Sequence, residues 1–201
     1  MRKPAPANWP LVDVIANRWS PRAFSARIPK AEILASLFEA ARWAPSAFNE
    51  QPWRFLVATQ EEPQAHATML SCLVEANQTW AVKAPVLAVL LTKKTFSHNG
   101  KSNRWFHHDA GLALENLLLQ AVAGGLVGHP MAGFDRDRIR EIYAVPDDFD
   151  PVTAVALGYP GDPQELDDEL RSRELAPRER LPLEQTVFSG SWGQAAPFVK
   201  E

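Results

Sequence analysis

The chain has 201 residues, of which 46% are hydrophobic, so it can bury the core of one domain without disulfides or metal ions. Its 21 Lys and Arg residues against 24 Asp and Glu give a formal net charge of −3. This balance creates no basic field, which argues against nucleic acids and anionic membranes as partners. The single cysteine, Cys72, excludes an intrachain disulfide and fits a reducing cytoplasm.

No targeting or membrane-spanning segment is predicted. Residues 1–10 contain three prolines and no apolar run, unlike a signal or transit peptide. The longest apolar stretch, residues 84–91, is too short to span a bilayer. We therefore expect one cytoplasmic domain over residues 1–201.

Prolines limit the first two predicted helices. Apolar residues at helical spacing lie between Leu11 and Trp19, and Pro21 ends this element. A second apolar stripe, residues 33–41, begins after Pro29 and ends before Pro45. The next elements predicted are a loop at 44–52, a strand at 54–59, one helix from about 63 to 81, and a buried strand at 86–92.

The strongest predicted helix covers residues 106–123. It is apolar on most sides, which is typical of a core or interface helix, and Gly124 and Gly125 end it. A short strand at 126–128, a helix at 135–143 capped by Asp135, and a strand at 152–158 follow. Residues 160–201 show no strong period but include Phe188 and Trp192, so we expect an extended arm packed on the body or on a second subunit.

Two arginine groups lie near opposite ends of the chain. Arg18, Ser20 and Arg22 alternate around Pro21, which favours an extended backbone with the three side chains on one face. Arg178 and Arg180 repeat this alternation. Guanidinium groups and a hydroxyl suit a phosphate, because they donate several charge-assisted hydrogen bonds. The alternative is that the arginines are solvated or pair with acids such as Asp13, Glu179 and Glu184.

A loop between the second helix and the first strand adds a specific signal. It reads Ala44-Pro45-Ser46-Ala47-Phe48-Asn49-Glu50-Gln51-Pro52-Trp53. Together with Arg18-x-Ser20-x-Arg22-x-Phe24, Asn77 before Ala84-Pro85-Val86, Gly133-Phe134-Asp135 and Arg178-x-Arg180-Leu181-Pro182, this sequence resembles the flavin-dependent nitroreductase family. The motifs occur in the family's order over about residues 15–182.

The resemblance implies an α+β, three-layer fold with a central mixed, mostly antiparallel sheet flanked by helices, and a C-terminal arm extending onto the partner subunit. It also implies a homodimer with two FMN molecules at the interface, NAD(P)H as electron donor, and a small-molecule acceptor such as a nitroaromatic, quinone or enone, reduced by a ping-pong mechanism. The chemistry belongs to FMN, so no catalytic side chain is implied.

The resemblance assigns the cofactor-binding residues to three groups. Arg18, Ser20, Arg22, Arg178 and Arg180 would hold the phosphate; Asn77 would contact the pyrimidine edge, and Gly133 would offer its N–H near the flavin N5. Ala132 stands where many relatives carry an acid, which leaves only a backbone contact there. The bulky Trp19 and Phe48 would narrow the cleft or make it aromatic. The partner subunit would contribute Pro45, Ser46, Ala47 and Asn49.

Other functions stay open or are set aside on the sequence. A metal site is not expected, because His107 and His108 are adjacent and point about 100° apart on a helix. His129 is interpreted as a packed, hydrogen-bonded residue. Relatives with the same fold break down flavin, dehalogenate or dehydrogenate heterocycles, and a non-catalytic FMN-binding protein is a further alternative.

Overall fold

The computed structural model describes residues 3–199, and its centre is a four-stranded sheet. The strands are β1 (Trp53–Thr59), β2 (Val86–Lys93), β3 (Val127–Met131) and β4 (Phe149–Gly158), in the order β1-β2-β4-β3. All three pairings are antiparallel. Seven of the eight residues of β2 are buried, as expected for an unbroken apolar run with layers on both faces.

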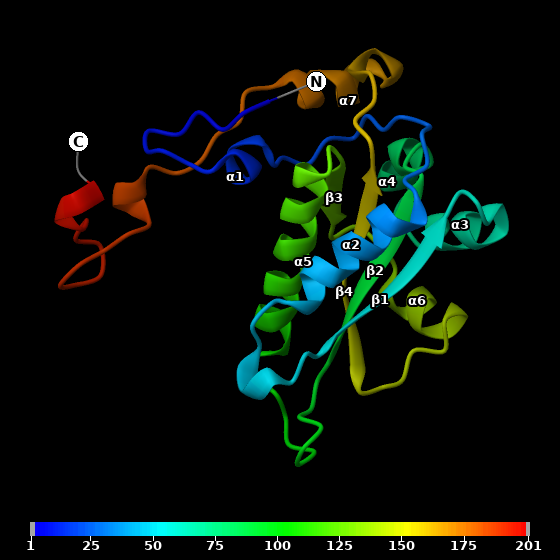
Figure 1. The fold of residues 1–201 in the computed structure, drawn as a ribbon, viewed down its shortest axis with the longest axis horizontal. Helices are drawn as coiled ribbons and strands as arrows, with labels where there is room; N and C mark the ends of the chain where they lie inside the picture. Colours follow the sequence, from blue (N-terminus) through cyan, green and yellow to red (C-terminus); the bar gives the residue numbers. More distant parts are fainter. Residues whose placement is uncertain (1–2, 200–201) are drawn as a thin grey trace.

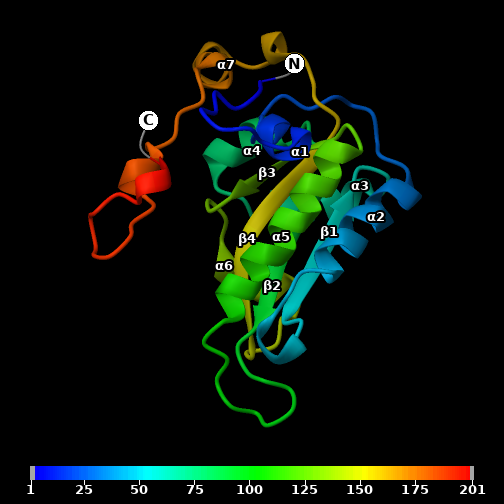
Figure 2. The ribbon, with the colours of Figure 1, turned by 60° about the vertical axis from the view of Figure 1, so that its left-hand side comes forward.

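Helices cover both faces of the sheet, which gives the expected three-layer α+β fold (Figures 1 and 2). On one face, α2 (Ala31–Arg42) and α5 (Phe106–Ala123) form a core with the sheet around Leu37, Leu90 and Leu117. On the other face, α3 (Pro63–Leu70), α4 (Glu75–Ala81) and α6 (Arg136–Ile142) enclose Met69, Trp80 and Ile139. The short α1 (Asp13–Asn17) lies beside α5.

The single helix predicted between residues 63 and 81 is wrong, because α3 ends at Leu70 and α4 begins at Glu75. At this break, the backbone forms hydrogen bonds with the segment after β3. The N–H of Val74 donates to the carbonyl of Gly133 at 3.1 Å, and the N–H of Asp135 donates to the carbonyl of Cys72 at 2.8 Å. Backbone groups committed to a distant segment cannot also continue a helical ladder.

The end of the chain contains a helix that the periodicity did not predict. Within the expected arm of residues 160–201, α7 (Asp168–Leu175) forms after the cap Asp167, whose carboxylate accepts from the N–H of Leu170 at 2.8 Å. This helix has no apolar stripe and is held by pairs such as Arg173 and Glu169, 2.6 Å apart. The chain after α7 extends away from the body on the same side as the N-terminal segment (Figure 1), and residues 200–201 lie outside the described part.

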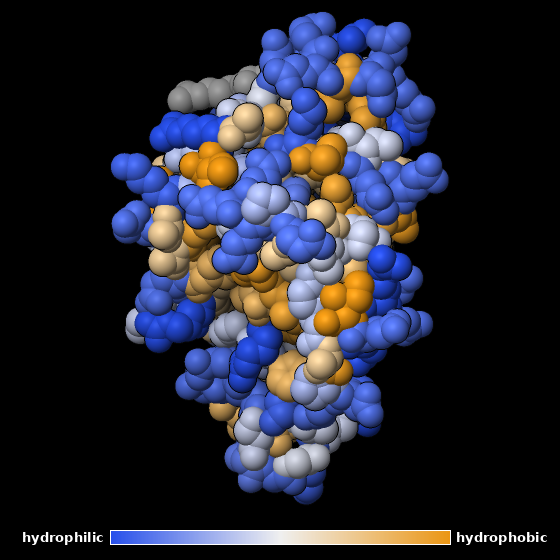
Figure 3. Space-filling view, turned by 90° about the vertical axis from the view of Figure 1, so that its right-hand side faces the viewer, coloured by the Kyte–Doolittle hydropathy of each residue, from blue (hydrophilic) through white to orange (hydrophobic). Residues whose placement is uncertain are grey.

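Large exposed apolar side chains gather on the terminal segments. Leu181 is 67% exposed, Phe198 72% and Trp192 92%. By contrast, the face shown in Figure 3 is covered mainly by hydrophilic residues with scattered hydrophobic ones. Clustered exposed apolar side chains mark an interaction surface more often than isolated ones do. The arm's docking on a partner subunit stays a prediction.

Candidate functional site

The structure brings together arginines from the two ends of the chain. Arg18 follows α1 in an extended conformation, with φ −67° and ψ 124°. The guanidinium of Arg178 donates to the carbonyls of Lys3 and Ala16, both at 2.8 Å. Burial lowers the pKa of Arg178, and the nearby positive charges of Arg18 and Arg180 lower it further. The positive charges of Arg18 and Arg180 are therefore near enough to act on Arg178.

Acidic side chains compensate little of this charge. Arg18 Nε lies 3.5 Å from Glu115 Oε1, whose side chain is half exposed. Arg180 is exposed and donates to the backbone carbonyl of Glu179 at 2.7 Å. Within residues 3–199, neither Asp13, Glu179 nor Glu184 forms an ion pair with these arginines. The pairing alternative is therefore wrong for these acids, while binding of a phosphate stays a prediction.

Arg178 and Arg180 line a groove of about 620 Å³ between the two terminal segments. Trp9 and Leu11 line it from the N-terminal side, and Leu181 lines it from the C-terminal side. Trp19 lies close to this region, with the ammonium of Lys3 4.9 Å from its ring centroid. The groove thus combines apolar walls with a cationic end, a combination that suits an amphipathic ligand or chain segment.

The turn that carries Ser20 and Arg22 is held from two sides. The carboxylate of Glu174 accepts from the N–H of Arg22 at 2.9 and 3.0 Å and from the N–H of Ala23 at 3.1 Å. On the other side, Nδ1 of His129 lies 3.0 Å from the carbonyl of Pro21. The Arg22 guanidinium lies 6.0 Å from the ring centroid of Trp80 and has no ion-pair partner among the described residues.

His129 is a packed, hydrogen-bonded residue, as predicted. Its ring centroid lies 4.7 Å from that of Trp80 in α4. Because a carbonyl only accepts, the contact with Pro21 requires a proton on Nδ1. The pKa of His129 is lowered from its usual 6.5 to about 4, mainly by burial. The backbone carbonyls of Pro21 and Ser20 oppose this shift, and the positive charge of Arg22 adds to it. His129 is therefore neutral at neutral pH.

This lowered pKa predicts a loss of stability in weak acid. The unfolded chain binds the His129 proton more tightly than the folded chain does, so the free energy of unfolding falls as the pH drops below 6.5 toward 4. We expect His129 to contribute about 2 kcal/mol of this loss between pH 7 and pH 5. Urea unfolding across this pH range measures it. In His129→Gln, which keeps a donor for Pro21 but does not titrate, that contribution should disappear; an unchanged pH profile would contradict the assignment.

Asn77 and Gly133 lie in direct contact. Asn77 Nδ2 donates to the Gly133 carbonyl at 3.0 Å. A Cβ on Gly133 would lie 2.7 Å from Asn77 Nδ2 and 2.7 Å from a methyl carbon of Val74. Among the described residues no hydrogen bond involves the Gly133 N–H. Ala132 precedes it directly after β3, with an exposed methyl group that offers no polar contact. A free backbone donor thus lies beside a fixed amide side chain.

The loop of Pro45, Ser46, Ala47 and Asn49 lies apart from the arginines. It forms the 3-10 turn η1 (Ala47–Asn49), near the start of α5, whereas α1 lies toward the other end of α5 (Figures 1 and 2). The N–H of Ala47 donates to Asp109 Oδ2 at 3.0 Å, and Ser46 Oγ accepts from the N–H of Gln51 at 3.0 Å. One chain therefore assembles two separate parts of the expected site.

This loop has an unusual backbone for its residue types. Phe48, Asn49 and Gln51 have positive φ values of 53°, 54° and 50°. A bulky residue in this region is strained, and such strain persists only where surrounding contacts impose it. The contacts include three hydrogen bonds from the backbone N–H and hydroxyl of Ser97 to Glu50, at 2.6–3.0 Å. Phe48 remains 83% exposed, with its ring edge-on to Phe96 at 5.5 Å.

Two buried acids that organise the site were missed by the sequence reasoning. Asp109, 2% exposed, anchors the loop through Ala47, and Glu174, 1% exposed, anchors the turn at Arg22. Asp109 lies in the first turn of a largely apolar helix, where a buried, unpaired charge would be costly, and this position is a usable signal. No local pattern identifies Glu174, because its partners lie 151 and 152 residues away.

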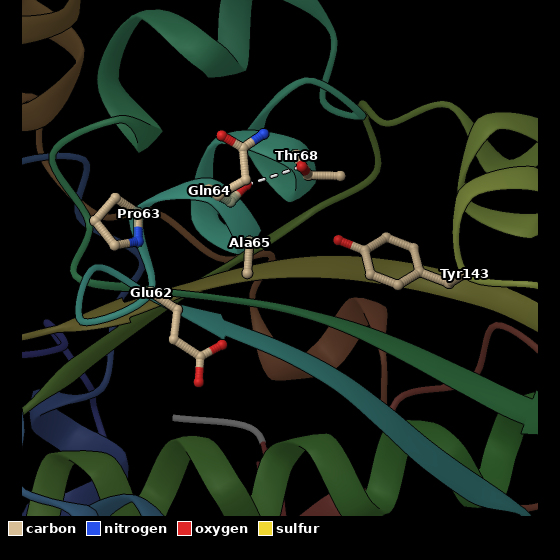
Figure 4. Close-up of a pocket in the computed structure, with 6 residues that line it drawn as sticks. All are labelled: Glu62, Pro63, Gln64, Ala65, Thr68 and Tyr143. Atoms are coloured by element: carbon tan, nitrogen blue, oxygen red, sulfur yellow. Dashed lines mark hydrogen bonds between the residues drawn. The ribbon is translucent and has the colours of Figure 1, made fainter.

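A second hollow, of about 460 Å³, is separate from these groups. It lies between the start of α3 and Tyr143, whose hydroxyl points toward α3 (Figure 4). The Tyr143 hydroxyl is buried without a hydrogen-bond partner among the described residues, and Thr68 donates to the carbonyl of Gln64 at 2.8 Å. The hollow shares no lining residue with the arginine groove. Residues 3–199 contain no cluster of three or more potential metal ligands.

Comparison with known proteins identifies the family. The model of the Nitroreductase family matches residues 15–159 of the chain. The chain belongs to the nitroreductase family. A solved structure of this fold, described as an oxidoreductase containing FMN, is 37% identical, with a TM-score of 0.89 over 94% of this chain and 96% of the other.

Curated proteins are also similar to this chain over most of their length. An NADH dehydrogenase from Thermus thermophilus is 30% identical over 78% of this nitroreductase-family chain and 84% of its own length. An uncharacterized 15.4 kDa protein from Mycolicibacterium smegmatis is 38% identical over 63% of this chain and 84% of its own. Among the described residues, no helix has both the length and the apolar character needed to cross a membrane.

Proposed function

We propose that this nitroreductase-family protein is an FMN-dependent oxidoreductase. It takes electrons from NAD(P)H and passes them to nitroaromatics, quinones or other electron-poor acceptors in a ping-pong sequence. The main structural support is the arginine cluster. Arg18, Arg178 and Arg180 come together from opposite ends of a chain with net charge −3. The similar protein with a TM-score of 0.89 is described as containing FMN, which gives this anion site a chemical candidate.

The residues present fit a flavin mononucleotide at both ends of that molecule. A dianionic phosphate matches guanidinium groups that have few acidic partners. A flavin ring needs hydrogen-bond donors in its plane and close approach to the backbone, and the free N–H of Gly133 beside Asn77 offers both. Because a Cβ on Gly133 would collide with Asn77 at 2.7 Å, only glycine lets the amide and this backbone lie so close together.

Each group then has a defined role. Arg18, Ser20, Arg22, Arg178 and Arg180 bind the phosphate, Asn77 binds the pyrimidine edge, and Gly133 donates its N–H to the ring. FMN supplies the hydride and electron transfer when it is bound. The side chains bind and orient the reactants and exclude water, and none has to act as an obligatory acid or base.

The proposal includes a homodimer in which each site takes residues from both chains. Its support is the separation of the Pro45–Asn49 loop from the arginines along α5, together with the exposed apolar side chains of the terminal segments. Pro45, Ser46, Ala47 and Asn49 of one subunit then cover the flavin of the other, and the C-terminal arm lies on the partner. The lone buried Cys72 fits a cytoplasmic location.

Purification tests the central claim. The protein should be yellow, and denaturation should release a flavin that mass spectrometry identifies as FMN, at about one molecule per chain. Steady-state oxidation of NADH or NADPH should then depend on an added acceptor such as menadione or nitrofurazone. If flavin-replete protein shows no turnover with either donor, it only stores or senses FMN; failure to bind any flavin would overturn the whole proposal.

Phe48 is expected to select aromatic acceptors. Its ring is 83% exposed and lies 5.5 Å from that of Phe96, on the loop assigned to cover the partner's flavin. In Phe48→Ala, loss of this stacking surface should raise the KM for menadione by about threefold to tenfold. Reduction of ferricyanide, which has no ring to stack, provides the internal control and should be unchanged. Equal changes for both acceptors would indicate a general distortion of the loop instead.

A further inference from the structure

Glu174 is a buried acid whose carboxylate binds only backbone donors among the described residues. It lies in the last turn of α7 and is 1% exposed. Its Oε1 accepts from the N–H groups of Arg22 and Ala23 at 3.0 and 3.1 Å, and its Oε2 accepts from Arg22 at 2.9 Å. A buried carboxylate is costly unless it is well hydrogen-bonded, so such a residue is retained where its geometry matters.

Hydrogen bonds at three successive residues, 21–23, hold the turn that Glu174 binds. The carbonyl of Pro21 contacts His129 at 3.0 Å, and the carbonyl of Ala23 accepts from the N–H of Gly161 at 2.9 Å. Glu174 supplies the remaining contacts, to the two N–H groups between these carbonyls. The backbone of residues 21–23, from which the Arg22 side chain projects, is therefore held by contacts with three separate segments.

The same short segment also places the second arginine group. Arg178 follows Glu174 by four residues, and its guanidinium donates to the carbonyls of Lys3 and Ala16. The ammonium of Lys3 returns to the backbone carbonyl of Glu174 at 2.7 Å. Residues 174–178 thus connect the N-terminal segment around Lys3, the end of α1 and the turn at Arg22.

We propose that Glu174 is a positioning residue for the phosphate-binding arginines, through which the protein prefers FMN over riboflavin. This inference rests on the proposed function, because it needs the flavin phosphate at the arginine cluster. Donors held in place before binding lose less conformational entropy when the ligand arrives. Glu174 touches no reacting group in this scheme: its carboxylate acts through Arg22, while its backbone carbonyl holds Lys3, which in turn contacts Arg178.

If only charge mattered, replacing Glu174 would strengthen FMN binding, whereas a positioning role predicts weaker binding. The direction of the change therefore distinguishes the two explanations. Removing a negative charge near a bound dianion should strengthen phosphate binding. Glu174→Gln removes that charge, but it also replaces one acceptor oxygen by an N–H₂ donor, and even when the amide oxygen takes the Oε1 position this donor faces the N–H of Arg22. The turn then has to move, and the arginines lose their alignment.

The experiment compares FMN and riboflavin binding to the flavin-free full chain by fluorescence quenching. In the wild type, FMN should bind at least about a hundredfold more tightly than riboflavin, because only FMN engages the arginines. In Glu174→Gln this preference should fall about tenfold, mostly through weaker FMN binding. Glu169→Gln, an exposed acid of the same helix, is the matched control and should keep the wild-type preference.

The outcomes distinguish failure of the phosphate assignment from failure of the positioning role of Glu174. If the wild type binds FMN and riboflavin equally, the phosphate assignment itself fails. If the wild type prefers FMN and Glu174→Gln keeps or increases that preference, the positioning role is overturned while the proposed function stands. Should Glu174→Gln not fold, Glu174→Asp keeps the charge but shortens the reach; a reduced preference supports the role, and an unchanged preference rejects it.

Discussion

Replacing Arg180 by alanine should weaken FMN binding by about tenfold to a hundredfold while leaving the folded chain intact. A charge-assisted hydrogen bond to phosphate contributes about 1.5–3 kcal/mol. Arg180 is exposed, and its hydrogen bond within the described chain goes to the neighbouring carbonyl of Glu179. Its removal therefore leaves no buried group unsatisfied, and the free energy of unfolding of the flavin-free protein should change by less than about 0.5 kcal/mol.

Arg178 gives the informative contrast. It lines the same groove, but its guanidinium also joins the carbonyls of Lys3 and Ala16 at 2.8 Å. Arg178→Ala should therefore lower both flavin affinity and stability. Arg173→Ala, which removes an exposed arginine of α7 paired with Glu169, should change neither quantity appreciably.

Three measurements decide the Arg180 prediction: the flavin retained after purification, the FMN dissociation constant and urea unfolding of the flavin-free form. Arg180→Lys keeps the charge but loses the planar guanidinium group. Its FMN dissociation constant should therefore lie between those of the wild type and Arg180→Ala. Full flavin occupancy in Arg180→Ala together with an unchanged dissociation constant would mean that the phosphate lies elsewhere.

Elements with their own hydrophobic period were predictable from the sequence. The bounds of α5 match residues 106–123, because an apolar helix ends at Gly124 and Gly125. The unbroken apolar run of β2 identified the buried central strand. In both cases the decisive information is local, so one window of sequence contains it.

Elements defined by distant contacts were not predictable in this way. The break between α3 and α4 exists because Cys72 and Val74 bond to the segment around Gly133, about sixty residues later in sequence. Helix α7 has no apolar stripe, since the side chain that it buries is the carboxylate of Glu174. Periodicity measures apolar faces, so a polar helix with one buried acid gives no signal.

The candidate site shows the same division. The alternating arginines around Pro21, and again between Pro177 and Pro182, predicted an anion site only in combination with the family resemblance, and the structure brings Arg18, Arg178 and Arg180 near one another. The pairing of Asn77 with Gly133 followed from the family resemblance and from no spacing rule. The loop around Ala47 is anchored on Asp109 and lies apart from the arginines in the single chain, and its contact with a second copy stays a prediction.

Replacing Gly133 by alanine should disrupt both folding and flavin binding. The new Cβ would lie 2.7 Å from Asn77 Nδ2 and from a methyl carbon of Val74, closer than packed atoms allow. Asn77 can retreat only by giving up its 3.0 Å hydrogen bond to the Gly133 carbonyl. We expect a loss of about 1–3 kcal/mol in the free energy of unfolding. Loss of the fixed amide should also weaken binding of FMN and riboflavin alike, because both share the ring.

A mutant cycle with Asn77→Ala tests whether this clash is the cause. Because Asn77→Ala removes the amide that the new Cβ meets, the double mutant should be destabilised less than the sum of the single mutants, by at least about 0.5 kcal/mol. Gly111→Ala is the control: its Cβ meets nothing within 4 Å inside α5, so it should stabilise the chain by about 0.5–1 kcal/mol. Additive costs in the cycle would show that the destabilisation has another cause, such as the clash of the new Cβ with Val74.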